Sequence, residues 1–168
     1  SNVKSKIASE VIMDENINFN LNWKFMLGEL TGFYVPGYND STWRTLDVPH
    51  DWSVEGKFDE QNPAGSSGGF LPTGIGCYRK HFLMPEGSKG KRVKIRFDGV
   101  YMNSSVYLNG VFLGNRPYGF STFEYDLTPH LKYNKEENII AVKVDNSLQP
   151  SARWYTGSGI NRNVYLLI

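Results

Sequence analysis

Residues 106–113 read Val-Tyr-Leu-Asn-Gly-Val-Phe-Leu, two apolar runs joined by Asn109-Gly110. A tight two-residue hairpin turn of type I′ needs positive φ at both central positions, and Asn followed by Gly adopts that conformation at low steric cost. The stretch therefore predicts a β-hairpin whose turn is centred on Asn109 and Gly110.

The same period of two continues on both sides of this hairpin. Apolar and polar residues alternate over 17–22 and 93–97, while 139–144 is almost continuously apolar. Alternation of this kind places one set of side chains on one face of a strand. Further strands are predicted at 23–27 and 164–168, where apolar residues are again concentrated.

About eight short strands separated by turn signals predict an all-β fold, an antiparallel β-sandwich of the jelly-roll kind. The one helical signal is Thr128-Pro129, with Thr128 as the cap and Pro129 at the first helical position. The core is predicted to consist of apolar and aromatic strand residues, namely Trp23, Phe25, Trp43, Val93, Ile95, Phe97, Val106, Leu108, Ile140, Val142, Val164 and Leu166.

The 168 residues are enough for one domain with a sizeable core. We expect a flexible N-terminal segment over 1–14, in which the leading Ser-Asn resembles the remnant of a cleaved tag, and a single domain over 15–168. Residues 59–76 are rich in Gly, Pro and Ser and predict a long loop. The strand-like sequence at the C-terminal end predicts further protein beyond Ile168.

Composition excludes several classes of function. The formal net charge is +1 and no run of Lys or Arg is present, so a nucleic-acid partner is not expected. No stretch has the length of a membrane-spanning helix, so a membrane partner is not expected either. The single cysteine, Cys77, permits neither an intrachain disulfide nor a CxxC metal site, and we predict no metal and no cofactor. The compartment stays open between cytoplasm and export.

Several segments, taken in order, resemble the N-terminal sugar-binding domain of glycoside hydrolase family 2, and within it the β-galactosidase branch. The block 97–110, with Phe-Asp-Gly-Val at its start and Leu-Asn-Gly at its end, and the block 154–160, Trp-Tyr-Thr-Gly-Ser-Gly-Ile, carry most of the resemblance. The supporting segments are 20–25, 43–52, 76–82, 123–128 and 138–146.

This resemblance implies a galactose-binding-domain-like jelly roll that precedes an immunoglobulin-like domain and a (β/α)8 barrel. In the family, two glutamates of the barrel hydrolyse glycosidic bonds with retention, and the N-terminal domain contributes loops to the substrate cleft. The implied function is that of a non-catalytic domain of a bacterial β-galactosidase-like enzyme. The implied partners are a β-galactoside, the remaining domains of the enzyme and further copies in a homo-oligomer.

No catalytic residue is predicted in this chain. Retaining hydrolysis needs two carboxyl groups about 5–5.5 Å apart, and no Glu here follows an Asn as one of the family's barrel glutamates does. A nucleophile–base pair of Cys77 with His50, His81 or His130 is the rival hypothesis. The position of Cys77 at the start of an apolar strand instead favours a buried, inert thiol.

The sugar-contacting residues are predicted from the resemblance. Arg153 is the first candidate, flanked by Trp154 and Tyr155, because a guanidinium beside aromatic rings suits hydroxyls and C–H faces of a sugar. Family members often carry a polar or acidic residue where Ala152 stands, which weakens the case for a galactose contact. For Trp154, packing is slightly favoured over stacking on sugar.

Two further candidates lie outside that block. Asn62, within the loop 59–76, could offer its amide to sugar hydroxyls, although a solvated loop is the favoured interpretation. Asp51 belongs to Pro49-His50-Asp51-Trp52, where a structural role is favoured: Asp51 capping a turn and Trp52 in the core.

Two other functions compete with the accessory-domain hypothesis. Autonomous carbohydrate-binding modules share the jelly roll, and fold analogy alone does not separate them. A purely structural oligomerisation domain is the third hypothesis. A saturable sugar site on the isolated chain would favour the former, and a large exposed apolar patch the latter.

Overall fold

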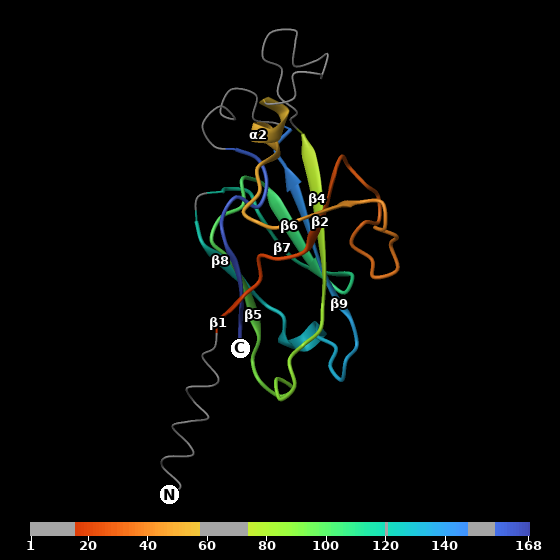
Figure 1. Ribbon diagram of the computed structural model, residues 1–168. Helices are drawn as coiled ribbons and strands as arrows, with labels where there is room; N and C mark the ends of the chain where they lie inside the picture. The colour runs from red at the N-terminus through yellow and green to blue at the C-terminus, as the bar shows by residue number, and fades with distance from the viewer. Residues whose placement is uncertain (1–15, 58–73, 120, 148–156) are drawn as a thin grey trace, which may run out of the picture.

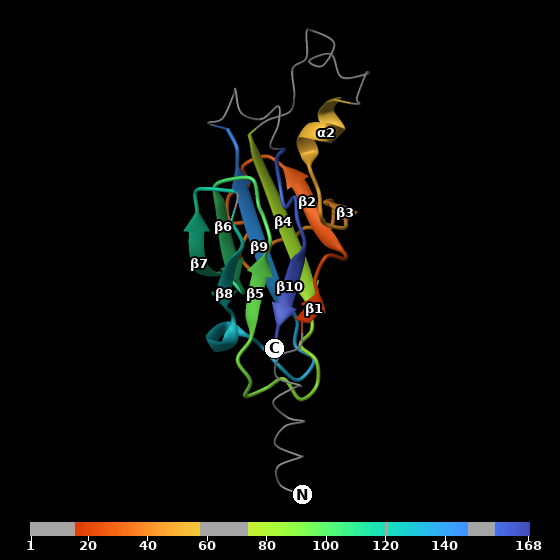
Figure 2. The ribbon, with the colours of Figure 1, turned by 90° about the vertical axis from the view of Figure 1, so that its left-hand side faces the viewer.

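The structure, a computed structural model, describes residues 16–57, 74–119, 121–147 and 157–168. Two antiparallel sheets pack face to face around one core, which confirms the predicted all-β sandwich (Figure 1, Figure 2). The first sheet has the strand order β1 (Asn16–Asn18), β10 (Val164–Leu167), β5 (Lys94–Phe97), β8 (Phe123–Asp126). The second has the order β3 (Arg44–Leu46), β2 (Trp23–Leu27), β4 (Ile75–Phe82), β9 (Asn138–Asp145), β6 (Ser104–Leu108), β7 (Val111–Arg116).

The predicted hairpin is confirmed as the β6–β7 pair. Asn109 and Gly110 have φ values of 50° and 86°, the positive values that the tight turn requires. The Asn109 side chain also fixes the neighbouring strand, because its Oδ1 accepts a hydrogen bond from Ile139 N at 2.9 Å. The turn residue therefore helps to set the register between β6 and β9.

The chain crosses repeatedly from one sheet to the other, as in a jelly roll. Strand β5 lies in the four-stranded sheet, whereas β6 and β7 lie in the six-stranded sheet and β8 returns to the first. The strand that opens the sandwich pairs with the strand that closes it, since Asn16 lies opposite Leu167. These long-range pairings bring residues far apart in sequence to the same end of the sandwich.

The predicted core is confirmed, because none of its side chains is more than 7% exposed. Most of these residues fill the space between the sheets, where Trp23, Ile95 and Phe97 are fully buried. Trp43 lies elsewhere, in a second cluster with Phe33, Cys77 and Ala141. This cluster forms where the connection 28–43 covers the outer face of the six-stranded sheet.

One buried charge holds this connection on the sheet. The guanidinium of Arg79, on β4, is fully buried and donates to the backbone oxygens of Phe33 at 2.6 Å and Val35 at 2.9 Å. Its Nε lies 2.9 Å from the Asp40 carboxylate. A buried charge is stable only when its hydrogen-bonding capacity is satisfied, and here the connection itself supplies the acceptors.

Two helical segments differ from the prediction. Helix α2 (Trp52–Lys57) was not expected from the sequence. The 3-10 helix η1 (Thr128–His130) occupies the predicted place, but Thr128 is not its cap. The Thr128 hydroxyl instead accepts from Val93 N at 2.8 Å, because β5 approaches the turn closely.

The predicted loop 59–76 is shorter at its C-terminal end, because β4 already begins at Ile75. Residues 58–73 of this loop, and the predicted flexible segment 1–14, lie outside the described residues. No helix among the described residues is both long and apolar enough to cross a lipid bilayer.

We predict that Arg79→Met lowers the free energy of unfolding by about 3–5 kcal/mol, because it leaves buried acceptors without their donor. Urea unfolding followed by tryptophan fluorescence measures the change. Arg92→Met is the matched control, since Arg92 forms an exposed ion pair with Asp126 and its loss costs about 1 kcal/mol or less. Equal losses for the two variants would contradict the anchoring role of Arg79.

Candidate functional site

Of the predicted sugar contacts, the structure describes Asp51 alone. Asn62 lies within 58–73, and Arg153, Trp154 and Tyr155 lie within 148–156, both outside the described residues. The described residues that flank these two segments nevertheless meet at one end of the sandwich, which we call the α2 end (Figure 1, Figure 2).

Asn146 joins the flanks of both segments. Its backbone N–H donates to Gly74 O at 2.8 Å, beside the first segment. Its side-chain amide donates to Ser158 Oγ at 2.6 Å and approaches Gly157 O at 3.4 Å, at the end of the second. Because Asn146 and Ser158 are fully buried, these contacts fix where the chain leaves and re-enters the sandwich.

Asp51 ties helix α2 to the residues after the second segment. Its Oδ1 accepts from Ser53 N at 2.9 Å and from Ser53 Oγ at 2.6 Å, which caps the first turn of α2. The same oxygen accepts from Ser158 N at 2.9 Å. The structure confirms the predicted capping role of Asp51 and the burial of Trp52, which is 3% exposed.

Close packing at Gly157 and Gly159 leaves no room for larger side chains. A Cβ on Gly157 would lie 2.5 Å from Asp51 Oδ2, and one on Gly159 would meet the Tyr78 hydroxyl. Both glycines also have positive φ, 79° and 123°. The Gly-Ser-Gly motif of the sequence is thus required by the approach of Asp51 and Tyr78.

A polar cluster extends from the core to α2 through His50. The His50 Nδ1 lies 2.6 Å from the Tyr78 hydroxyl, and its Nε2 contacts Glu55 Oε1. Arg44 binds the same carboxylate through both terminal nitrogens, at 2.5 Å and 2.8 Å. Helix α2 is therefore held at its N-terminus by Asp51 and along its side by Arg44 and His50.

The environment sets the protonation of this cluster. Burial lowers the pKa of His50, although the hydrogen bond with Glu55 acts in the opposite direction. The hydrogen bonds from Arg44 lower the pKa of Glu55, and burial raises the pKa of Tyr78. A neutral His50 can donate from Nε2 to the Glu55 carboxylate and accept at Nδ1 from the Tyr78 hydroxyl. In this protonation state each of the three side chains has a hydrogen-bond partner.

Cys77 lies away from this cluster, and among the described residues its thiol forms no hydrogen bond with a histidine. The thiol is fully buried beneath the connection 28–43 and donates to Gly28 O at 3.4 Å. Burial raises its pKa to about 11, so the thiolate is not formed near neutral pH. The buried, inert thiol predicted from the sequence is the one observed.

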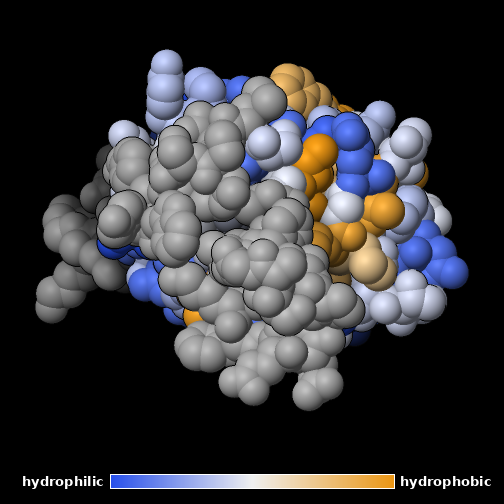
Figure 3. Space-filling view, turned by 90° about the horizontal axis from the view of Figure 1, so that it is seen from above, coloured by the Kyte–Doolittle hydropathy of each residue, from blue (hydrophilic) through white to orange (hydrophobic). Residues whose placement is uncertain are grey.

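Apolar side chains are exposed beside the α2 end. Figure 3 views the molecule from this end and shows a hydrophobic strip next to the grey atoms. Leu27 and Val54 are 43% and 44% exposed, on the end of β2 and on α2. Exposed apolar surface next to a polar cluster is typical of an interaction surface.

Comparisons with known proteins place this geometry in a family. The model of the glycosyl hydrolases family 2 sugar-binding domain matches residues 18–168. The chain belongs to this family. The sequence resemblance to the N-terminal domain of glycoside hydrolase family 2 is thereby confirmed.

The similar proteins are glycosidases. A β-galactosidase of Bacteroides ovatus, BoGH2A, is 54% identical over 95% of this chain and 19% of its own length. A putative β-glucuronidase of Formosa agariphila is 49% identical over 89% of this chain and 14% of its own. The crystal structure of a β-glycosidase from Bacteroides vulgatus is 53% identical, with a TM-score of 0.79, over 91% of this chain and 20% of that one.

The chain spans about a fifth or less of these relatives. It corresponds to the non-catalytic sugar-binding domain of the family and not to the part of a glycosidase that cleaves bonds. Sequence reasoning did not find the Arg44–Glu55–His50 cluster, although Arg44 and His50 both lie in the segment 43–52, because the cluster also needs Glu55 of helix α2, which was not predicted. Asn146 ends the segment 138–146, which contributed only to the family resemblance, and nothing in its neighbours indicates that it joins two loops.

We predict that stability falls, in part through His50, as the pH drops below about 6.5. Burial lowers the pKa of His50, so in this range the unfolded chain binds the proton more readily, and acid favours unfolding. Urea unfolding at pH 7.5 and 5.0 should show a smaller acid loss for His50→Gln than for the unaltered chain. His130→Gln is the control, and a decline that is identical in all three proteins would refute the role of His50.

Proposed function

We propose that this domain forms one wall of the sugar cleft of a retaining β-galactosidase-like enzyme whose catalytic carboxylates lie outside this chain. The observation that carries the proposal is the meeting, at the α2 end, of the residues that flank both candidate segments. Gly74, Asn146 and Ser158 are joined by hydrogen bonds there. The described residues next to the segments that contain Asn62 and Arg153–Tyr155 therefore lie at the same end of the sandwich.

In this proposal Arg153 donates to sugar hydroxyls, and Tyr155 or Trp154 covers an apolar C–H face. An Arg guanidinium offers several N–H donors in a fixed plane, which suits adjacent hydroxyls. Asn62 contributes its amide from the other segment. Because Asp51 Oδ1 already accepts three hydrogen bonds, Asp51 acts as a positioning residue for the segment that ends at Gly157.

The names of the relatives support a β-galactoside as the substrate class. The relative at 54% identity is named a β-galactosidase, and the one at 49% a putative β-glucuronidase. The two sugars differ in the group carried at C5 and in the hydroxyl at C4. The proposal of a galactoside rests on the name of the relative at 54% identity, because the guanidinium of Arg153 suits a carboxylate as well as hydroxyls.

The apolar strip beside the α2 end supplies the contact with the remaining domains of the enzyme. Leu27 and Val54 lie at the rim from which the candidate segments emerge, so packing there would hold the wall against the barrel. A homo-oligomer of the enzyme would use other faces of the domain.

We predict that the isolated chain shows no saturable binding of galactose or lactose at tens of millimolar, because the site needs the barrel to complete it. Backbone amide shifts of the chain labelled with nitrogen-15 measure this. Saturating shifts at 50–55 and 157–160 would instead support an autonomous carbohydrate-binding module.

In the enzyme that contains this domain, Arg153→Ala should lower kcat/KM for a β-galactoside about tenfold or more, through loss of a charged hydrogen bond. Arg92→Ala, an exposed arginine far from the α2 end, should leave kcat/KM unchanged. Unaltered kinetics for Arg153→Ala would refute its contact with the sugar.

A further inference from the structure

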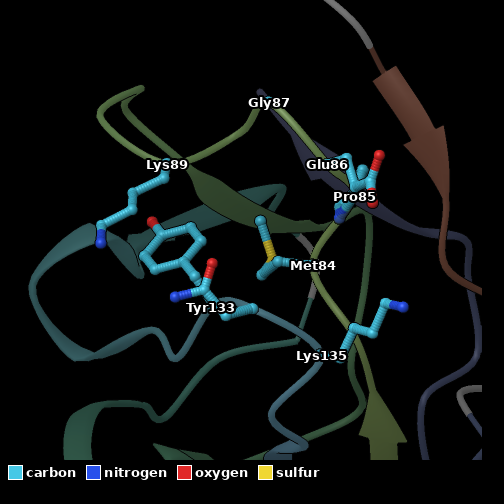
Figure 4. A pocket seen from close by; sticks show the side chains of 8 residues that line it. Met84, Pro85, Glu86, Gly87, Lys89, Tyr133 and Lys135 are labelled. Atoms are coloured by element: carbon cyan, nitrogen blue, oxygen red, sulfur yellow. The ribbon is translucent and has the colours of Figure 1, made fainter.

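A hollow lies at the opposite end of the sandwich from α2. The connection from β4 to β5 and the connection from η1 to β9 form its walls, and the hollow, which is open to solvent, has a volume of about 450 Å³ (Figure 4). Both connections lie at the lower end of the molecule in Figure 1, whereas α2 lies at the upper end. A volume of this size suits a small ligand such as one or two sugar units.

The walls of the hollow are three hydrogen-bonded tight turns. Ser88 N donates to Pro85 O at 3.3 Å, and Lys91 N donates to Ser88 O at 3.1 Å. On the facing connection, Glu136 N donates to Tyr133 O at 3.3 Å. Positive φ values at Gly87 and Gly90 fit the third position of type II turns. The hollow is therefore preformed by local backbone geometry.

Its lining combines an apolar floor with polar groups at the rim. Met84, which is 8% exposed, lies beside the ring of Tyr133 (Figure 4). Asn134 adds an amide and Lys89 and Lys135 add ammonium groups. An aromatic ring with amide and ammonium donors is the combination that recognises the C–H face and the polar substituents of a pyranose.

The charge of the lining favours an anionic ligand. Lys89 and Lys135 take part in no ion pair among the described residues. Glu86 is the one carboxylate that lines the hollow. Lys89 and Lys135 lie on opposite sides of the hollow (Figure 4). Two ammonium groups against one carboxylate leave an excess of positive charge around the rim, which attracts an anionic group.

Lys135 occupies a position where the backbone favours another residue. Asn134 and Lys135 have φ values of 61° and 63°, so both central residues of the turn 133–136 are left-handed. Asn followed by Gly is the preferred pair for such a turn. Lysine at this position is less favourable for the backbone than Gly, and it places an ammonium group at the rim of the hollow.

We propose that this hollow is a second, non-catalytic saccharide site, which takes a pyranose bearing an anionic substituent, either a carboxylate or a sulfate. The site is separate from the proposed cleft wall, because the two lie at opposite ends of the sandwich. It would hold a charged part of a polysaccharide chain on the domain without taking part in bond cleavage.

The test is a titration of the nitrogen-15-labelled chain with methyl β-D-glucuronide and with galactose 6-sulfate, followed by backbone amide shifts. We expect saturating shifts at 84–91 and 133–136 for at least one of them, and the stronger of the two identifies the anionic group. Neutral methyl β-D-glucoside should bind about tenfold more weakly, as expected for loss of a charge-assisted contact.

Substitutions of single lysines distinguish binding in the hollow from non-specific attraction to the positive charge of the surface. Lys89→Gln and Lys135→Gly should each weaken binding of the anionic sugar about tenfold. Lys135→Gly should also fold at least as well as the unaltered chain, because Gly is favoured at this φ. Lys94→Gln removes an exposed lysine that does not line the hollow and should leave the affinity unchanged.

Three results would overturn the proposal. The first is an absence of saturating shifts in these two turns with either anionic sugar at tens of millimolar. The second is equal affinity for free sulfate or acetate, which would reduce the hollow to a simple anion site. The third is an equal loss in Lys94→Gln. In a special case of the first result, shifts confined to 50–55 and 157–160 would also contradict the expectation that the α2 end binds no sugar without the barrel. An absence of shifts at 84–91 and 133–136 alone leaves the proposed cleft wall untouched, so the two proposals fail separately.

Discussion

The central constraint of this fold is that strand β4 is buried on both faces. The inner face of β4 packs in the core, and its outer face is covered by the connection 28–43. Every polar side chain on β4 therefore has to find a partner within the protein. Arg79 satisfies this requirement with backbone oxygens of the connection, and the Tyr78 hydroxyl does so with His50. The packing of the connection 28–43 on the outer face of the sheet and the polar cluster at the α2 end therefore both depend on β4.

Much of the fold could be predicted because its signals are local. The period-two alternation over 93–97, the Asn109-Gly110 turn and the apolar core residues each depend on neighbours in sequence, and each is confirmed. The alternation over 17–22 is confirmed only in part, because β1 ends at Asn18 and Leu21 is 58% exposed. Helix α2 was missed because it has only six residues and contains Gly56, a poor helix former. The capping carboxylate of Asp51 also binds Ser158, which is 107 positions away in sequence. A contact between residues so far apart leaves no signal in a local sequence pattern.

The candidate site was predictable only in part, for a related reason. The capping role of Asp51 follows from its place before Trp52-Ser53, where an Asp side chain can reach the next backbone N–H groups. Arg79, by contrast, resembles a solvent-facing residue of an alternating strand, because the connection that buries it lies some forty residues earlier in the chain. The sugar contacts assigned to Arg153, Trp154, Tyr155 and Asn62 stay predictions.

The antiparallel pairing of β1 with β10 has a mechanical consequence. Asn16 lies opposite Leu167, so tension applied through the chain before residue 16 and after residue 168 acts on one end of a single strand pair. Such a load peels hydrogen bonds one after another and does not shear them all at once. The first structure to yield under tension is thus the β1–β10 pair, while the core strands β4 and β9 lie outside the direct line of force.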